Sequence, residues 1–460
     1  MLFSSNVFLF AFLPTVLAIY YLVPRFLRNP VLLLVSLIFY GWGEPVYLLL
    51  MLAAILLNYG FGMWIWIIRR KGKGAKGVLA AGIAANLLLL GYFKYASFLM
   101  SALSALIPGL RNIPIPAVEL PIGISFYIFQ SMSYIIDVYR DDAPVQKNPL
   151  TFGTYVALFP QLIAGPIVRY RDIAQQLSSR WENLRDFSSG VLLFIVGLSK
   201  KVLLANPLGE AWLLLQQETG PAAAWVGLAA YTLQIYFDFS GYSDMAIGLG
   251  RLLGFEFLEN FRYPYVSASV TEFWRRWHIS LSTWFREYVY IPLGGNRYGK
   301  GRQILNLLVV WFLTGLWHGA SWNFALWGLY YAALLIMEKL FLLKTLERLP
   351  KLVKHLYTLL AVMIGWALFY FEDMGVLGAF LGRLWLPAAA SPGSFPLILS
   401  YLPLLAAAAF AATPIPAFVA AKGNTPGFQF VKAVAAACGF LLCVGALASQ
   451  SYNPFIYFRF

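Results

Sequence analysis

The sequence predicts an all-α, polytopic membrane protein, and three observations support this. The chain has 460 residues, of which 60% are hydrophobic and only 12% are charged, whereas a soluble protein carries about 25% charged residues. Its mean hydropathy is +0.70. Apolar runs of roughly 20 residues, the length that crosses a bilayer as a helix, recur along the chain. We expect about eleven transmembrane helices plus one or two re-entrant segments.

The charge balance and the cysteines narrow the class further. The formal net charge is +14, and in a membrane protein such an excess marks cytoplasmic loops rather than a nucleic-acid partner. The two cysteines, Cys438 and Cys443, lie in one apolar run. Their spacing indicates neither a disulfide framework nor a metal site.

The first apolar runs predict the orientation of the chain. Phe8–Val23 lacks the basic start of a signal peptide and is read as the first spanning or re-entrant segment. Two more runs follow, separated by a turn at Gly41–Pro45. The later of these two runs ends in the basic cluster Arg69–Lys76, which predicts a cytoplasmic loop. Counting back over these spans places the N-terminus outside the cytoplasm.

The next segments predict two spanning regions and one re-entrant region. Gly77–Leu106 is a long apolar stretch that we expect to break at Gly91–Lys94, and the Pro-rich loop Ile107–Pro121 would then be extracytoplasmic. Ile122–Val138 crosses back. Thr151–Ile167 has cationic residues on both flanks and a Gly-Pro pair inside. This pattern predicts a re-entrant segment that enters and leaves on the cytoplasmic face.

The remaining apolar runs predict helices in a single polytopic domain, residues 1–460. No linker is long and polar enough to divide the chain, and no repeat of 20–50 residues is visible. The expected helical runs are Val191–Val202, Ala222–Leu253, Ile304–Trp317, Phe324–Met337, Leu352–Phe371, Phe395–Phe410 and Phe428–Leu447.

A polar stretch interrupts the run Ala222–Leu253. Gln234, Asp238 and Tyr242 recur at every fourth position and share a helix face, and Asp244 follows them. An ionised aspartate at mid-bilayer costs about 2.5–3.5 kcal/mol. The stretch is therefore either a polar seam that holds helices together or the wall of a water-filled cavity near an active site.

The stretch Thr271–Asn323 holds two of the three histidines, His278 and His318. We expect a continuous amphipathic helix over Glu272–Arg286 at the cytoplasmic interface. On such a helix five residues would share one face: Trp274, Arg275, His278, Leu281 and Ser282. An anchoring helix would explain the arginines alone. The third histidine, His355, lies among lysines and is expected in a loop.

A glycine-rich cationic loop follows at Pro292–Arg302 and contains Asn296 and Arg297. Such a loop can surround a phosphate with backbone N–H groups and positive charges. It is not a Walker motif, because no Gly-Lys-Ser/Thr closes it.

His318 ends the apolar run Ile304–Trp317 and is followed by Gly319. An ionisable residue inside a membrane indicates function by default; the alternative is a hydrogen-bonded core residue. No serine or cysteine nucleophile motif accompanies it. The few histidines and carboxylates lack metal-ligand spacing, so we expect no metal.

Three motifs resemble the signature of the membrane-bound O-acyltransferase family: Thr271–Ser282, Leu293–Arg297 and Trp317–Gly319. Five others resemble its bacterial alginate-acetylating branch: Phe3–Phe10, Pro121–Gln130, Tyr134–Arg140, Phe159–Pro166 and Tyr236–Gly248. The resemblance covers roughly residues 1–340. The D-alanyl transferase branch shares the histidine motifs but not the first or the last of these five, and it ranks second.

The resemblance implies helices around a central funnel in the bacterial inner membrane. It implies transfer of an acetyl group from cytosolic acetyl-CoA, a substrate rather than a bound cofactor, to an extracytoplasmic polysaccharide through a partner enzyme of the SGNH-hydrolase type. His318 matches the essential histidine of the family, and His278 matches its second recurrent histidine. A histidine near its usual pKa can act as a general base worth about 10²–10⁴-fold, or His318 carries the acetyl group transiently.

The expected site therefore has two parts. The donor phosphates would be bound by Arg275, Arg276, Arg286, Asn296 and Arg297, with Lys300 and Arg302 nearby. The cavity would be lined by Gln234, Asp238, Tyr242, Asp244, Ser282, Trp317 and Asn323. A transporter or flippase for a polysaccharide precursor is the alternative from another class. Transporters commonly show two related halves, which this sequence lacks.

Overall fold

The computed structural model describes residues 1–110, 113–115, 118–163, 165–387, 389–423, 425–449 and 456, and the regular elements in these ranges are all helices. The all-α prediction is confirmed for this part of the chain. Within it, seven helical segments are long and apolar enough to cross a bilayer: Leu48–Arg70, Lys76–Leu106, Leu184–Leu215, Trp322–Glu347, Lys351–Tyr370, Ser394–Ala411 and Pro426–Ser449. The expected count of about eleven is not confirmed.

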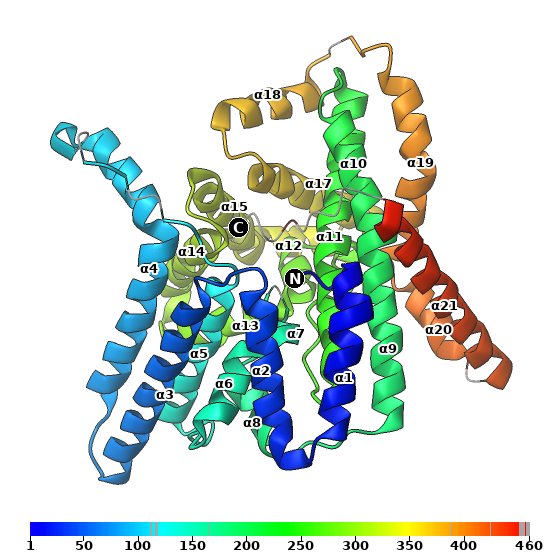
Figure 1. Cartoon of the computed structure of the whole chain (residues 1–460). Helices are drawn as coiled ribbons and strands as arrows, with labels where there is room; N and C mark the ends of the chain where they lie inside the picture. The colour runs from blue at the N-terminus through cyan, green and yellow to red at the C-terminus, as the bar shows by residue number, and fades with distance from the viewer. Residues whose placement is uncertain are drawn as a thin grey trace. The chain divides into compact units, whose positions relative to one another are not determined.

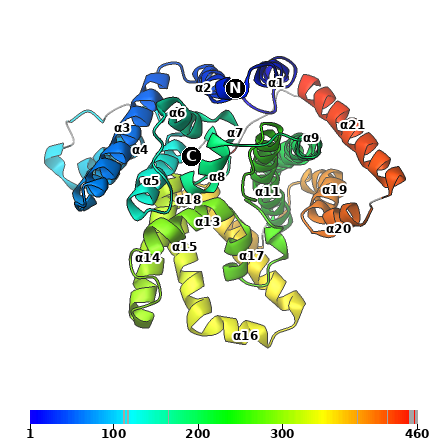
Figure 2. The ribbon, with the colours of Figure 1, turned by 90° about the horizontal axis from the view of Figure 1, so that it is seen from below.

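The chain packs as two compact units. The first comprises Met1–Val191 and Ala246–Leu258, and the second comprises Leu192–Met245 and Glu259–Phe460. The expectation of a single domain stays a prediction. Figures 1 and 2 show the helices of both units in two views.

The first unit contains α1 to α8 and the start of α9. Their bounds are α1 (Leu13–Leu22), α2 (Arg28–Gly41), α3 (Leu48–Arg70), α4 (Lys76–Leu106), α5 (Ile124–Arg140), α6 (Pro149–Ala157), α7 (Phe159–Leu162), α8 (Tyr170–Ser178) and α9 (Leu184–Ser199).

Two buried asparagines connect α3 and α4, which form an antiparallel pair (Figure 1). Asn58 Nδ2 donates to Asn86 Oδ1 at 3.0 Å, and Asn86 Nδ2 donates back at 2.7 Å. The expected break at Gly91–Lys94 does not occur, because α4 is continuous over 31 residues. One glycine inside a helix costs only about 1 kcal/mol, and buried Lys94 donates from Nζ to Ser125 Oγ at 3.1 Å.

Short helices occupy the segment that was predicted to be re-entrant. α6 has nine residues and α7 has four, with Leu158 between them. At 1.5 Å per residue, α6 is about 14 Å long, half the hydrocarbon thickness of a bilayer. Neither helix is long enough to span the bilayer by itself, which is what a re-entrant segment requires. The membrane face that this segment enters stays a prediction.

The second unit contains the end of α9, α10, most of α11 and all later helices. Their bounds are α10 (Asn206–Leu215), α11 (Pro221–Leu252), α12 (Val270–Arg276), α13 (Ile279–Phe285), α14 (Gly299–His318), α15 (Trp322–Met337), α16 (Leu343–Glu347), α17 (Lys351–Tyr370), α18 (Met374–Trp385), α19 (Ser394–Ala411), α20 (Ile415–Lys422) and α21 (Pro426–Ser449).

The helices α14 and α15 lie side by side in both views (Figures 1 and 2), and their backbones meet at two glycines. A Cβ atom added at Gly315 would lie 2.2 Å from the Phe324 carbonyl oxygen, and one at Gly328 would lie 2.3 Å from that of Trp311. Only glycine permits such an approach. This contact fixes the end of α14, where His318 lies.

Candidate functional site

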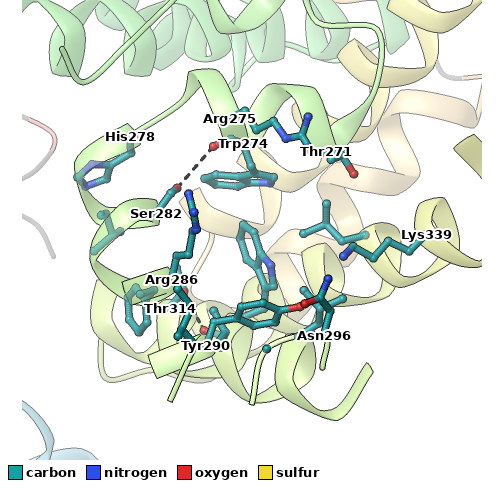
Figure 3. A pocket seen from close by; sticks show the side chains of 18 of the residues that line it. Thr271, Trp274, Arg275, His278, Ser282, Arg286, Tyr290, Asn296, Thr314 and Lys339 are labelled. Carbon is teal, nitrogen blue, oxygen red and sulfur yellow. Dashed lines mark hydrogen bonds between the residues drawn. The ribbon is translucent and has the colours of Figure 1, made fainter. Parts of the chain in front are cut away.

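A hollow of about 670 Å³ lies in the second unit (Figure 3). Its volume is within the range of ligand-binding pockets, about 300–1,000 Å³. Arg275, Arg286, Arg297 and Lys339 line it, and none of the described lining residues is Asp or Glu. Figure 3 shows Arg275, Arg286 and Lys339 reaching it from three sides. A hollow with four cations and no acid favours an anionic ligand.

The predicted continuous helix over Glu272–Arg286 is wrong. The chain breaks between α12 and α13, where His278 adopts a left-handed conformation with φ 46°. Histidine is among the non-glycine residues that tolerate this region. The five side chains grouped on that helix nevertheless all line the hollow. Ser282 Oγ donates to the Trp274 carbonyl at 3.5 Å and connects the two short helices (Figure 3).

The N-terminus of α12 is held by three side chains. Ser269 Oγ accepts from the Glu272 N–H at 3.0 Å, and Glu272 accepts from the Ala268 N–H at 2.9 Å. This arrangement differs from a capping box only in that the carboxylate binds the N–H one residue before the N-cap. Glu338 accepts from the N–H groups of Val270 at 2.7 Å and Thr271 at 2.8 Å. A carboxylate is stabilised at a helix N-terminus, so Glu338 positions the helix that carries Arg275.

Asn260 orients His278. Its Oδ1 accepts from the Ser280 N–H at 3.1 Å and lies 3.2 Å from His278 Nδ1. An amide oxygen only accepts hydrogen bonds, so Nδ1 carries the proton and Nε2 is the unprotonated nitrogen. The Phe239 ring packs edge-on at 4.7 Å from the imidazole. Burial lowers the pKa of His278 to about 3, which keeps the ring neutral at physiological pH.

The glycine-rich loop reaches the hollow through two positive φ angles. Gly294 has φ 103° and Gly295 has φ 57°, and a Cβ atom at Gly294 would lie 2.6 Å from the Tyr298 ring. Asn306 Nδ2 donates to the Gly295 carbonyl at 2.9 Å and fixes the loop to α14. Asn296 and Arg297 line the hollow, and their role in binding a donor stays a prediction.

Three other predicted cations lie elsewhere. Arg276 pairs with Glu272 at 2.8 Å and does not line the hollow, and neither do Lys300 or Arg302. Arg302 Nε donates to the Leu293 carbonyl at 3.1 Å, so it supports the loop from behind.

His318 lines a second, much smaller cavity of about 20 Å³. Asp238 lines it as well, together with two isoleucines and five aromatic residues: Ile235, Ile456, Phe239, Trp277, Trp327, Trp366 and Phe369. A cavity needs roughly 10–15 Å³ to hold one water molecule. The cavity therefore holds one small group and excludes bulk water.

Aromatic rings surround His318, which is 6% exposed. The rings of Trp317, Trp327 and Phe369 pack edge-on against the imidazole at 5.0, 5.0 and 5.2 Å. The ring of Trp317 also lies 6.0 Å from that of His278. Each hollow is thus lined by one histidine. Trp317, which was predicted to line the cavity, lines neither hollow but packs against both imidazoles.

The polar residues of α11 do not all lie at the histidine cavity. Asp238 pairs with Lys201 at 2.6 Å, both side chains being less than 5% exposed, and also accepts from the Ile456 N–H at 2.8 Å. Asp244 pairs with Lys200 at 2.6 Å. Gln234 and Tyr242 are buried but line neither hollow. Asp238 is thus the residue of this face that lines the histidine cavity.

Two further predicted residues lie outside both hollows. Asn323 is buried and donates from Nδ2 to the Phe369 carbonyl at 3.1 Å. His355 was expected in a loop but lies on α17. Its Nδ1 donates to the Ser267 carbonyl at 3.0 Å. Asn260 and Glu338 were not predicted from the sequence. Their hydrogen-bond partners lie 18 and 68 residues away along the chain.

Comparison with known proteins identifies relatives. Residues 139–371 match the model of the membrane-bound O-acyltransferase family. The chain is 42% identical to a probable alginate O-acetylase, AlgI, of Pseudomonas putida over the whole of both chains. It is 33% identical to the peptidoglycan O-acetyltransferase of Helicobacter pylori, over 81% of this chain and 78% of the relative. It is 28% identical to the teichoic acid D-alanyltransferase of Bacillus subtilis over 48% of this chain and 59% of the relative.

Proposed function

The chain belongs to the membrane-bound O-acyltransferase family, and from this premise we propose that it transfers acetyl groups from acetyl-CoA to an alginate-like polysaccharide. Membership makes it a multi-pass membrane O-acyltransferase. The acetyl group and the polysaccharide are proposed because the relative that aligns over its whole length is named an alginate O-acetylase.

The cationic hollow is the observation that carries the donor assignment. Coenzyme A bears phosphates, and Arg and Lys side chains bind phosphate through charge-assisted hydrogen bonds. Arg275, Arg286, Arg297 and Lys339 supply four such groups around about 670 Å³. Asn296 and the backbone of the glycine-rich loop add neutral donors.

His318 is the proposed base. The acceptor hydroxyl attacks the thioester carbonyl, its proton passes to the imidazole, and the C–S bond breaks to release the thiol. If His318 instead carries the acetyl group, its ring nitrogen attacks the thioester carbonyl and the C–S bond breaks to release the thiol. The acceptor hydroxyl then attacks the acetyl-imidazole, the C–N bond breaks, and the hydroxyl proton passes to the freed imidazole. In both cases the enclosed cavity keeps water from the acetyl group.

The proposed orientation places the donor hollow on the cytoplasmic side of the inner membrane and the N-terminus outside. The basic cluster Arg69–Lys76 supports it through the positive-inside rule. The acceptor is then reached from the other face, by way of an extracytoplasmic SGNH-hydrolase-like partner.

The test is an acetyl-transfer assay with purified protein in nanodiscs, labelled acetyl-CoA and deacetylated alginate oligomers, with and without the partner. We expect His318→Ala to lose about 10²–10⁴-fold in transfer while it still binds CoA. Transfer by this variant at the normal rate would exclude the role of His318. Transfer from a D-alanyl carrier protein instead of acetyl-CoA would favour the teichoic acid alternative, and movement of an unmodified saccharide without acetylation would favour a flippase.

A further inference from the structure

Five of the side chains that line the small cavity around His318 are aromatic, and several of them pack against one another. The Trp366 ring lies 4.8 Å from Trp277 and 6.3 Å from Trp327. Trp366 Nε1 donates to the Tyr265 hydroxyl at 3.2 Å, and that hydroxyl donates to the Thr232 carbonyl. Wall residues that are packed and hydrogen-bonded in this way yield little to a larger guest.

The space beside the imidazole is about 20 Å³, roughly what one water-sized or methyl-sized group requires. Phe369, at 5.2 Å from the His318 ring, and Trp327, at 5.0 Å, close it on the imidazole side. Ile235 of α11 contributes to the same wall. An acyl carbon at the imidazole could place one methyl group here, and a further methylene would collide with a ring.

We propose that this cavity is the acyl subsite, and that Phe369, Trp327 and Ile235 restrict the transferred group to two carbons. The inference rests on the proposed function and deepens it, because it makes the walls of the histidine cavity the determinant of acyl length. The reaction is that given above: the acceptor oxygen bonds to the acyl carbon, the C–S bond breaks, and the proton reaches the thiol through His318. The methyl group occupies the cavity throughout.

The large hollow does not limit acyl length in this scheme. It has about 670 Å³ and carries four cations beside apolar and aromatic side chains, and in this scheme the cations bind the donor through its phosphates regardless of acyl length. Discrimination between acyl groups therefore resides in transfer and not in donor affinity. Acetyl-, propionyl- and butyryl-CoA should bind with similar affinity and differ in the rate of transfer.

The experiment measures transfer from these three thioesters by the full chain in nanodiscs. One unaccommodated methylene discriminates by about 10–200-fold, so the wild type should prefer acetyl over propionyl by that factor. Phe369→Ala should lower this ratio at least about 10-fold. Ile235→Val, which removes one methylene from the wall, should lower it less and is the variant that decides if Phe369→Ala does not fold.

Phe380→Ala is the matched control. Phe380 is 1% exposed and packs against Trp212 and Phe371 at 5.5 and 5.0 Å, and it lines neither hollow. Its acetyl-to-propionyl ratio should equal that of the wild type.

Two results would overturn the inference alone: a wild type that transfers propionyl as fast as acetyl, or folded Phe369→Ala and Ile235→Val variants that keep the wild-type ratio. A wild type that transfers no acyl group from any of the thioesters, with the partner present, would overturn the proposed function and this inference with it.

Discussion

Arg275 and Arg276 are neighbours in sequence, but only Arg275 lines the large hollow. A charge-assisted hydrogen bond contributes about 1.5–3 kcal/mol, so Arg275→Ala should raise the apparent donor KM about 10-fold or more and lower kcat less. Arg276→Ala should leave KM nearly unchanged, because it loses only a part-exposed ion pair with Glu272, worth about 0.2–1 kcal/mol. Steady-state kinetics with varied acetyl-CoA measure both. A fall in kcat at constant KM in Arg275→Ala would indicate a structural role instead.

His278 makes a pH-dependent contribution to stability with a definite sign. Its pKa falls from the ordinary 6.5 to about 3 on burial, so the unfolded chain binds the proton more readily. The contribution of His278 to the free energy of unfolding is therefore complete above about pH 6.5 and is lost as pH falls toward 3. At pH 5 the loss amounts to about 2 kcal/mol. His278→Asn, which also tolerates a left-handed conformation, should remove this part of the acid sensitivity.

Thermal unfolding of wild type and His278→Asn in detergent at pH 7.5 and pH 5 measures the effect. The variant can be less stable at both values, since only the difference between them reports the titration. Equal differences in the two proteins would show that His278 does not remain neutral in the folded state.

Single residues could be predicted from the sequence where their chemistry was unusual for their surroundings. His318 at the end of an apolar run and Arg275 beside His278 are such cases, and both line a hollow. Asn260 and Glu338 could not be predicted, because their partners come from distant parts of the chain. Nothing in the local sequence distinguishes these residues from other polar side chains.

At the scale of elements, the contact between α14 and α15 determines where His318 lies. Gly315→Ala would place a Cβ atom 2.2 Å from a backbone oxygen of α15, which cannot rotate away as a side chain could. We expect the helices to separate, at a cost of about 1–3 kcal/mol, and acetyl transfer to fall strongly. CoA affinity should fall as well, because residues of both helices line the large hollow. Transfer rates and CoA affinity of the purified variant measure the two effects.

Gly301→Ala is the control on the same helix. A Cβ atom at Gly301 meets nothing within 4 Å, and alanine favours helix, so activity should stay normal. A Gly315→Ala protein with normal transfer would show that the position of His318 does not depend on this contact.

Element boundaries followed from the sequence only where local residues determine them. The end of α14 at His318 coincides with the predicted end of an apolar run before Gly319. The break between α12 and α13 was missed, because periodicity cannot report a positive φ that is stabilised by Asn260, a residue outside the helix. The prediction of a break in α4 was wrong because it relied on a polar interruption in the sequence. Burial of Lys94 in the tertiary structure compensates for that interruption.

At the scale of the whole molecule, composition predicted a membrane protein but not its number of spans. Hydropathy identifies helices whose side chains are apolar all round. α5 carries Ser, Gln and Asp side chains that are buried inside the first unit, and its 17 residues do not qualify as a candidate span. A helix enclosed by protein can satisfy polar groups there, so its sequence lacks the uniform apolarity that lipid requires.

The orientation of the chain is tested by cysteine labelling. α4 has 31 residues and is about 46 Å long, which exceeds the hydrocarbon thickness of about 30 Å, so it is long enough for its two ends to lie on opposite sides of the membrane. Lys73 precedes it and Ile115 follows it, both exposed. In a background with Cys438→Ser and Cys443→Ala, we expect an impermeant maleimide to label Lys73→Cys only from the cytoplasmic side and Ile115→Cys only from the outside.

A third position connects this orientation to the donor site. Tyr298 is 74% exposed and adjoins Arg297 of the cationic hollow. Acetyl-CoA is cytosolic in the proposed reaction, so Tyr298→Cys should be labelled from the same side as Lys73→Cys, and saturating CoA should slow its labelling. Labelling of Tyr298→Cys from the side of Ile115→Cys would place the hollow opposite the donor. The four cations would then have to serve an anionic ligand outside the cell, such as the carboxylates of the polysaccharide itself.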